Sequence, residues 1–348
     1  MRPNYKFTAV LVLLLILCSV GLLLSLFPLA GHMRDLIDVF RAYASFGSIE
    51  LELFTYPPME QDAGIVRQSP KLVPRMLHQI ILEEGRNSSF AKYISARESC
   101  TSLHSDWEHM LWTDSNATAF VMTHYPDVVP HYMRYAQTIQ RTNILRYLLL
   151  HHYGGVYLDI DITCRVPLDT LLHLPFVTPG AHPAGINNAF ILARPQHPFL
   201  GETIARIPSR DISWPMPYVE NMLTTGCMFI TNAWIAYVRD NKALQWQDKV
   251  FVLADEHRAL ESHMLRGETT TPLFKHGGAS SWHSWDAKLI VFIGAHGKKI
   301  FLAVGLVVPV LVILVVMYIL RWRVGRLQRR RLSGKDQEIP WEEKIHSH

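Results

Sequence analysis

Cysteine is scarce in this chain: four cysteines occur among 348 residues, and their spacing matches no zinc-binding motif. So low a cysteine content excludes a small disulfide-dense scaffold. The sequence also lacks internal repeats, whereas glycine and proline, with 19 and 20 residues, occur at ordinary frequencies. These absences leave a globular chain with one large domain or two small ones.

Charge is missing from two long apolar segments. Phe7–Ala30 and Ile300–Leu320 run for about 24 and about 21 residues without Asp, Glu, Lys, Arg or His, and about 20 apolar residues suffice for a transmembrane helix. We predict that both segments span a membrane. The first could instead be a cleaved signal peptide, although it exceeds the usual apolar core of about 7–15 residues. Because neither segment carries an ionisable side chain, a receptor or channel subunit with an ion pathway is disfavoured.

Basic residues set the predicted orientation. Two precede the first segment, and six arginines within residues 321–331 follow the second, against only Lys298 and Lys299 before it. The positive-inside rule therefore places both termini in the cytoplasm and residues 31–299 in the lumen. The net charge of +4 comes mostly from the C-terminal arginines, so it does not indicate a nucleic-acid partner.

Glycosylation and disulfide chemistry are compatible with a lumenal domain. Sequons begin at Asn87 and Asn116 and mark candidate glycosylation sites. One disulfide can form among the three cysteines of the lumenal part, and the sequence leaves the pairing open: Cys100, Cys164 and Cys227.

The predicted organisation has six parts. They are a cytoplasmic N-terminus (1–6), a transmembrane helix (7–30), an amphipathic stem and linker (31–73), a lumenal domain (74–296), a second transmembrane helix (300–320) and a basic cytoplasmic tail (321–348). Apolar residues at helical spacing within 32–47 predict an amphipathic helix. That helix could lie on the membrane surface or pack under the domain.

Within the lumenal domain, apolar runs alternate with a long helical pattern. Strands are expected at 76–82, 107–112, 156–160, 188–193 and 225–231, and a helix at 131–152, between Pro130 and Gly154. Strands that alternate with helices predict an α/β domain with a mostly parallel sheet.

The most informative motif is Gly154-Gly155-Val156-Tyr157-Leu158-Asp159-Ile160-Asp161. Residues i and i+2 of a strand point to the same side, so Asp159 and Asp161 are expected to converge while Ile160 turns into the core. Two converging carboxylates suit a divalent cation that also binds phosphate oxygens. Ligands of open α/β sheets bind at the carboxyl ends of strands, which is where this pair lies. The two glycines allow a sharp turn and a close approach to a ligand.

A second candidate group lies on the helix at 131–152. Asn143, Arg146 and Tyr147 share one helical face, and a guanidinium at Arg146 can grip a diphosphate with two hydrogen bonds. Tyr147 is expected in the core. His151 and His152 at the helix end are interpreted as structural, because a cation suits the helix dipole there.

Further candidates follow predicted strands or precede the second apolar segment. His78 and Gln79 lie at the end of the first strand, and Asn187 and Asn188 precede a later one. His283 could join the carboxylates around a metal. Trp282 could stack on a base or sugar, although a tryptophan there also fits a membrane-surface aromatic belt.

Together these segments resemble a known family. Met76-Leu77-His78-Gln79-Ile80, Asn143-Ile144-Leu145-Arg146-Tyr147 and the aspartate motif are similar to those of DXD-containing glycosyltransferases of the Och1-like and glucosylating-toxin type. Shorter pieces agree, including Asn188-Ala189-Phe190-Ile191, Thr225-Gly226 and Ser281-Trp282-His283. The resemblance covers residues 74–287. With two spans, the chain most resembles the fungal mannosyl inositol phosphorylceramide synthases.

The resemblance implies a GT-A-like, Rossmann-type nucleotide-sugar transferase domain between two transmembrane helices. It implies Golgi (or ER/Golgi) membrane residence, GDP-mannose as donor, Mn²⁺ (or Mg²⁺) as cofactor, inositol phosphorylceramide as acceptor and a membrane regulatory subunit. It also implies retention of anomeric configuration. An N-glycan mannosyltransferase and an inactive membrane partner are the alternatives.

Carried over by motif, Asp159 and Asp161 would bind the metal and Arg146 the donor, with His283 as a late ligand. The donor-binding set would then comprise His78, Gln79, Asn143, Arg146, Gly154, Gly155, Tyr157, Asn187, Asn188 and Trp282. Two positions depart from the family pattern. Asn143 stands where the family commonly has Asp, and Cys227 stands where Pro is common.

Overall fold

The computed structural model describes residues 51–58, 70–82, 90–182, 185–241, 243–278 and 285–290, with a few single positions beyond. The chain divides into two units, residues 1–284 and 285–348, and the α/β domain lies in the first. The predicted first span, stem helix and C-terminal tail, together with Asn87, Trp282, His283 and nearly all of the second span, lie outside the described residues. Within the part that is described, no helix is both long and apolar enough to cross a bilayer.

A seven-stranded mixed sheet forms the centre of the domain, with strand order β1-β8-β6-β7-β4-β2-β3. Its strands are β1 (Leu53–Thr55), β2 (Met76–Ile80), β3 (Glu108–Trp112), β4 (Gly155–Leu158), β6 (Phe176–Thr178), β7 (Phe190–Ala193) and β8 (Phe251–Ala254). Only β7 runs antiparallel to its neighbours β4 and β6. The predicted mostly parallel α/β sheet is therefore confirmed, with one reversed strand.

A smaller antiparallel sheet has the order β5-β10-β9. It consists of β5 (Ile162–Cys164), β9 (Glu268–Thr270) and β10 (Phe274–Gly277). Its register pairs His276 with Ile162, so the end of β10 lies beside the segment that follows β4.

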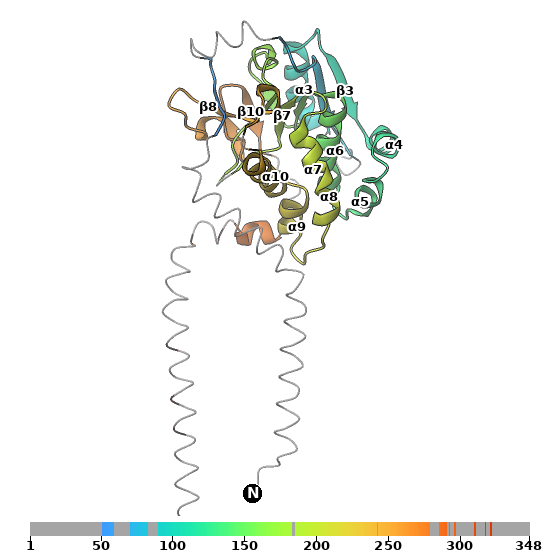
Figure 1. Cartoon of the computed structure of the whole chain (residues 1–348), viewed down its shortest axis with the longest axis vertical. Helices are drawn as coiled ribbons and strands as arrows, with labels where there is room; N and C mark the ends of the chain where they lie inside the picture. The colour runs from blue at the N-terminus through green and yellow to red at the C-terminus, as the bar shows by residue number, and fades with distance from the viewer. Residues whose placement is uncertain are drawn as a thin grey trace, which may run out of the picture. The chain divides into compact units, whose positions relative to one another are not determined.

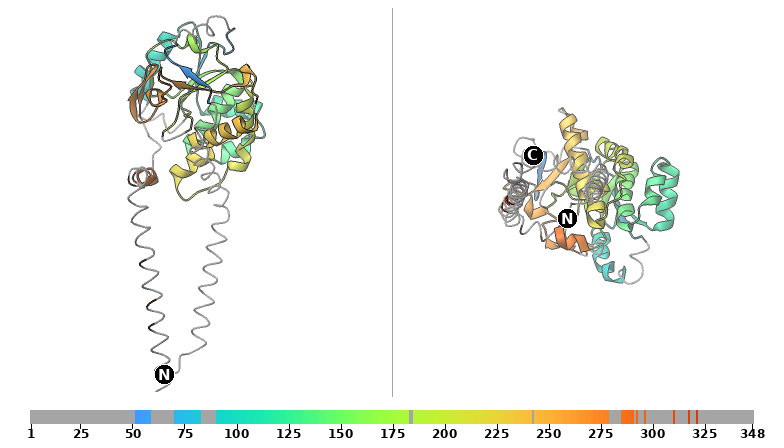
Figure 2. Two further views of the ribbon diagram at one scale, coloured as in Figure 1. Left: turned by 60° about the vertical axis from the view of Figure 1, so that its left-hand side comes forward. Right: turned by 90° about the horizontal axis from the view of Figure 1, so that it is seen from below.

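Eight α-helices occur among the described residues of the first unit: α3 (Phe90–Leu103), α4 (Asp114–His124), α5 (Val129–Arg134), α6 (Thr138–Tyr153), α7 (Pro198–Ala205), α8 (Ile207–Arg210), α9 (Pro217–Thr224) and α10 (Cys227–Asp240). Three single-turn 3₁₀ helices accompany them: η2 (Asp169–Leu171), η3 (Trp246–Asp248) and η4 (Glu261–His263). Figures 1 and 2 show α4 to α7 gathered on one side of the domain.

Two hydrophobic cores lie on opposite faces of the large sheet, and strand β4 shows how the sequence divides between them. Tyr157 belongs to the core under α4, α6, α7 and α10. Its neighbours Val156 and Leu158 belong to the core that includes Cys100 of α3. All four residues of β4 are buried, because a central strand with both faces covered has no exposed side.

Two sequence predictions need correction. The strand expected at 225–231 is wrong, because helix α10 begins at Cys227. An apolar run of this length fits either structure, and here the helical spacing of buried residues continues through Ala233 and Tyr237. The helix expected at 131–152 is two helices, α5 and α6, and Gln137 forms a capping box with Gln140 at the start of α6.

The disulfide that the sequence left open joins Cys100 to Cys164, and Cys227 is free. It ties α3 to β5 across 64 residues of chain. Because β5 follows Asp161 directly, this bond fixes one side of the segment that carries the aspartates.

We predict that the Cys100→Ser, Cys164→Ser variant is destabilised by about 2–4 kcal/mol, because the unfolded chain regains the entropy of an open loop. The measurement is thermal unfolding of the detergent-purified chain with and without reductant. Reductant should lower the melting temperature of the wild type and leave that of the variant unchanged. Equal melting temperatures for the two proteins would contradict the assignment.

Candidate active site

The two aspartates lie in the short connection between β4 and β5. The backbone N–H of Asp159 donates to the Ala189 carbonyl over 2.8 Å, and the Ile162 N–H donates to the Asp159 carbonyl over 3.1 Å. Asp159 and Asp161 therefore converge through a turn. The sequence had suggested that they converge along one strand. Ile160 is only partly buried, so its predicted place in the core is wrong.

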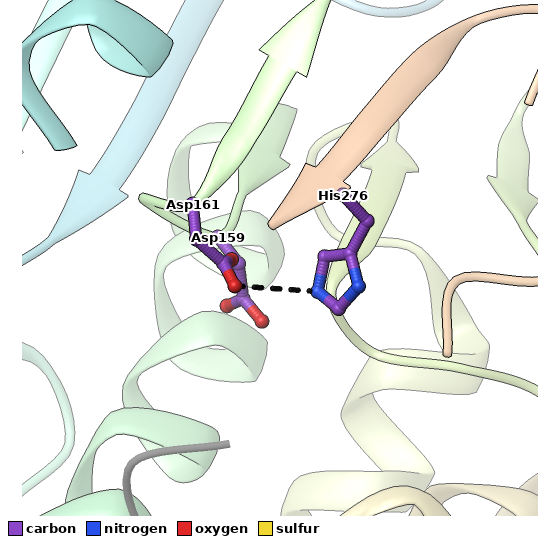
Figure 3. A group of neighbouring side chains, drawn as sticks. All are labelled: Asp159, Asp161 and His276. Atoms are coloured by element: carbon purple, nitrogen blue, oxygen red, sulfur yellow. Dashed lines mark ion pairs between the residues drawn. The ribbon is translucent and has the colours of Figure 1, made fainter. Parts of the chain in front are cut away.

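His276 of β10 completes a group of three potential metal ligands with Asp159 and Asp161 (Figure 3). One ligand atom from each residue lies within 4.8 Å of the others. His276 Nε2 is 3.5 Å from Asp161 Oδ2, and His276 Nδ1 lies 2.7 Å from the Gly267 carbonyl oxygen. Since a carbonyl can only accept, Nδ1 carries a proton, and in the neutral imidazole Nε2 then offers its lone pair to a metal.

This donor set fits a divalent cation. Two carboxylates and one neutral imidazole suit Mn²⁺ and related transition ions, and they leave coordination positions for phosphate oxygens. Sequence reasoning missed His276, because only the pairing of β10 with β5 brings it to the aspartates. The expected ligand His283 lies outside the described residues.

Asp159 is held by two donors on a single oxygen. Arg146 Nη2 donates to Asp159 Oδ1 over 2.6 Å, and the Tyr157 hydroxyl donates to the same atom over 2.7 Å. The Arg146 guanidinium also lies over the Tyr157 ring, 4.9 Å from its centroid. Burial raises the pKa of Asp159, while the Arg146 charge acts in the opposite direction.

Arg146 and Asn143 are thus joined to the aspartate and are not displayed to solvent. The Arg146 side chain is 5% exposed, and its Nη1 donates to Asn143 Oδ1 over 2.7 Å. Asn143 is also buried. The contact of Arg146 with the donor stays a prediction, and its buried Nε has no hydrogen-bond partner among the described residues.

The region around Asn143 is a buried polar cluster. Asn188 Nδ2 donates to Asn143 Oδ1 over 3.1 Å and to the Tyr147 hydroxyl over 3.0 Å. Tyr147 is fully buried, as expected. The Cys227 thiol donates to Asn188 Oδ1 over 3.2 Å. Asn143 and Cys227, the two residues that depart from the family pattern, therefore both form a hydrogen bond with Asn188.

His78 and Gln79 of β2 differ in their partners. The Trp112 indole N–H donates to His78 Nδ1 over 3.2 Å, so Nε2 carries the proton and donates to the Gly154 carbonyl over 2.9 Å. Burial lowers the pKa of His78 to about 4. Gln79 is also buried, but its Nε2 has no hydrogen-bond partner among the described residues. Of the two, only Gln79 has a donor left for a ligand.

The two glycines are required by packing at the foot of β4. Both have a positive φ, 67° at Gly154 and 96° at Gly155. An added Cβ would lie 2.6 Å from Pro195 Cδ at the first position and 2.6 Å from the Met76 carbonyl oxygen at the second. These glycines start the strand whose other end carries Asp159, so their role in the fold is structural.

Two other sequence candidates serve local structure. Asn187 Nδ2 donates to the Leu265 carbonyl over 2.9 Å, and its Oδ1 accepts from the Ala189 N–H over 2.7 Å. Asn116, a predicted glycosylation site, is exposed in the first turn of α4. There its Oδ1 accepts from the Thr113 N–H over 2.6 Å.

Comparison with known proteins agrees with this geometry. Residues 91–176, which include both aspartates, match the family described as "Glycosyltransferase sugar-binding region containing DXD motif". The chain is 31% identical over 265 residues to Inositol phosphoceramide mannosyltransferase 3 of Schizosaccharomyces pombe, covering 75% of this chain and 71% of that protein. The chain belongs to the inositol phosphoceramide mannosyltransferase family.

A second member of this family is similar over a smaller part of its length. Mannosyl phosphorylinositol ceramide synthase CSH1 of Saccharomyces cerevisiae is 30% identical, over 69% of this chain and 61% of that protein. Among solved structures, PaToxG glycosyltransferase aligns with 16% identity and a TM-score of 0.37, over 60% of this chain and 81% of that one. That score is too low to support an argument about function.

We predict that Asp159→Asn destabilises the metal-free protein far more than Asp161→Asn does. Loss of the Asp159 charge leaves the buried Arg146 guanidinium uncompensated, which typically costs about 3–5 kcal/mol. Asp161 instead adds a like charge beside Asp159 and raises its pKa. Thermal unfolding in EDTA should show a large fall in melting temperature for Asp159→Asn only, and equal falls would contradict the ion pair.

The buried His78 predicts a pH dependence of stability. Its folded pKa of about 4 lies below the ordinary value of 6.5, so the unfolded chain takes up a proton first as the pH falls. Stability contributed by neutral His78 is therefore present above pH 6.5 and declines below it, by up to about 1.4 kcal/mol per pH unit.

His78→Gln should flatten the dependence of the melting temperature on pH between 6.5 and 4.5. Glutamine can still accept from Trp112 and donate to Gly154, but it does not titrate. His257, whose side chain is 81% exposed, supplies the control variant His257→Gln, which should keep the wild-type slope. A wild-type slope in His78→Gln would show that His78 is not the group responsible.

Proposed function

We propose that this protein transfers mannose from GDP-mannose to the inositol of inositol phosphorylceramide, with a divalent cation, Mn²⁺ or Mg²⁺, at Asp159, Asp161 and His276. The observation that carries the proposal is the convergence of these three ligands at the carboxyl end of β4, within the DXD region of the family. The relatives named above carry this acceptor in their names.

The charge of the site suits departure of a nucleoside diphosphate. A bound divalent ion would stabilise the negative charge that develops on the leaving phosphate, so no proton donor is needed. Asp159 and Asp161 would hold that ion, and neutral His276 would complete the set without adding charge. The charge of Arg146 counteracts the rise in the pKa of Asp159 that burial causes.

The donor would extend from the metal along the carboxyl ends of β4 and β2. Gln79 supports this placement, because it is buried near the end of β2 with its Nε2 donor unused among the described residues. Retention of configuration would follow from attack on the same face as the departing phosphate. Trp282 and His283 could contact the donor or metal from the segment after β10.

The acceptor supports a membrane location for the whole chain. A ceramide-anchored head group cannot leave the bilayer, and tethering an enzyme beside it raises its effective concentration. Two apolar segments that flank the domain would provide such tethers, with both termini cytoplasmic and the domain in the Golgi lumen. A membrane regulatory subunit is part of this proposal.

The deciding experiment assays the detergent-purified full chain with Mn²⁺ and inositol phosphorylceramide, offering GDP-mannose beside UDP-sugars. We expect a mannosyl lipid from GDP-mannose only, abolished by EDTA. Asp161→Asn should reduce the rate by about 100- to 1000-fold, the usual effect of removing a group that stabilises transition-state charge. Asp106→Asn, which removes an exposed partner of Arg75, is the matched control and should retain wild-type activity.

Activity that survives Asp161→Asn would overturn the metal assignment. Transfer to a glycoprotein N-glycan instead of the lipid would favour the N-glycan mannosyltransferase. No product from any donor, together with no binding of GDP in the presence of Mn²⁺, would identify an inactive relative.

A further inference from the structure

A chain of hydrogen bonds connects the C-terminal end of helix α9 to the Asp159 carboxylate, with Arg146 donating toward both ends. It begins at Asn221 and Thr225, whose Oδ1 and Oγ1 accept from Asn143 Nδ2 over 2.8 and 3.2 Å. From Asn143 it continues through Arg146 to Asp159. Sequence alone does not indicate that any of these residues acts through another.

Arg146 fixes the direction of this chain, since a guanidinium can donate hydrogen bonds but cannot accept them. The atom of Asn143 that faces Arg146 Nη1 at 2.7 Å must therefore be its oxygen. The amide nitrogen then faces Asn221 and Thr225 and needs acceptors there. Asn143 has two partners on its oxygen and two on its nitrogen, so protein atoms use its full hydrogen-bonding capacity.

The other end of the chain sets the geometry of Asp159. Arg146 Nη2 and the Tyr157 hydroxyl both donate to Oδ1. With that oxygen held by two donors, Oδ2 is the atom that can turn to an ion. The orientation of the carboxylate thus depends on Arg146, and the orientation of Arg146 depends on Asn143.

We propose that Asn143 is a positioning residue for the metal, which orients Arg146 so that Asp159 presents one defined oxygen to the ion. This inference rests on the proposed function, because it requires a cation at Asp159 and Asp161. Asn143 would act through the hydrogen bond that its Oδ1 accepts from Arg146 Nη1.

Two substitutions distinguish the contribution of the Asn143 side-chain oxygen from that of its nitrogen. Asn143→Asp keeps an acceptor for Arg146 and Asn188 but removes the donor to Asn221. Asn143→Leu has a similar volume and removes both. If the acceptor for Arg146 is what matters, Mn²⁺ affinity should fall by 10- to 100-fold in Asn143→Leu, the usual effect of losing a residue that orients a ligand. The fall should stay within about threefold in Asn143→Asp, since the bond that orients Arg146 is kept.

The experiment measures Mn²⁺ binding to the detergent-purified full chain by electron paramagnetic resonance of the free ion. In parallel, mannosyl transfer is followed as a function of Mn²⁺ concentration. Asn143→Leu should raise the Mn²⁺ concentration for half-maximal activity by the same 10- to 100-fold, because a weaker site needs more of the ion to fill it.

Thr231→Val is the matched control for lost stability. Thr231 is buried, and its Oγ1 accepts from the Ile186 N–H over 3.0 Å, outside the hydrogen-bond chain that ends at Asp159. This variant should lower the melting temperature and leave Mn²⁺ affinity unchanged. A residue with a merely structural role would behave like this control.

The possible outcomes are distinct. Wild-type Mn²⁺ affinity in folded Asn143→Leu, or equally weak binding in both Asn143 variants, overturns this inference and leaves the proposed function standing. A wild-type chain that binds no divalent ion overturns the proposed metal and this role together. Tight binding by the wild type and Asn143→Asp, with weak binding by Asn143→Leu, supports the inference.

Discussion

The ion pair between the buried Arg146 and the partly buried Asp159 is the interaction on which the site depends. It joins the middle of α6 to the turn that follows β4, and its two atoms are 2.6 Å apart. A guanidinium in the interior is tolerated only when it is paired and hydrogen-bonded. The fold around it meets that condition with Asn143 on one side and Tyr157 stacked against it.

This arrangement gives the two aspartates different environments. Asp159 accepts hydrogen bonds from the Arg146 guanidinium and the Tyr157 hydroxyl. Asp161 instead lies next to His276, and its backbone carbonyl accepts from the Gly277 N–H of β10 over 2.9 Å. One carboxylate is therefore anchored to the helical layer and the other to the small sheet. A cation between them would hold the two layers together.

The sequence located the centre of the site because its signals there are local. Eight consecutive positions contain two glycines, an apolar strand and two aspartates separated by one residue. Asn143 and Arg146 lie within one turn of a helix. Strands β2 and β4 and helix α6 were predictable for the same reason. The disulfide pairing and His276 were not, because both depend on contacts between segments far apart in the chain.

The errors in secondary structure have a related cause. The run Cys227-Met228-Phe229-Ile230-Thr231 is apolar and partly β-branched, which suits a strand as well as the start of a helix. The helix is decided by Ala233 and Tyr237, which pack in the core. Both residues lie beyond the five-residue run, so that run alone does not distinguish a strand from a helix. The aspartate turn was similarly hidden, since spacing alone cannot show that β4 ends at Leu158.

The position of His276 near the end of the described domain has a consequence for biosynthesis. During translation, β4 and both aspartates leave the ribosome well before β10 does, so the early chain contains the two carboxylates without His276. Two carboxylates alone bind metal ions less selectively than the complete set. Binding of the proposed ion by the complete set would therefore require that the small sheet has formed.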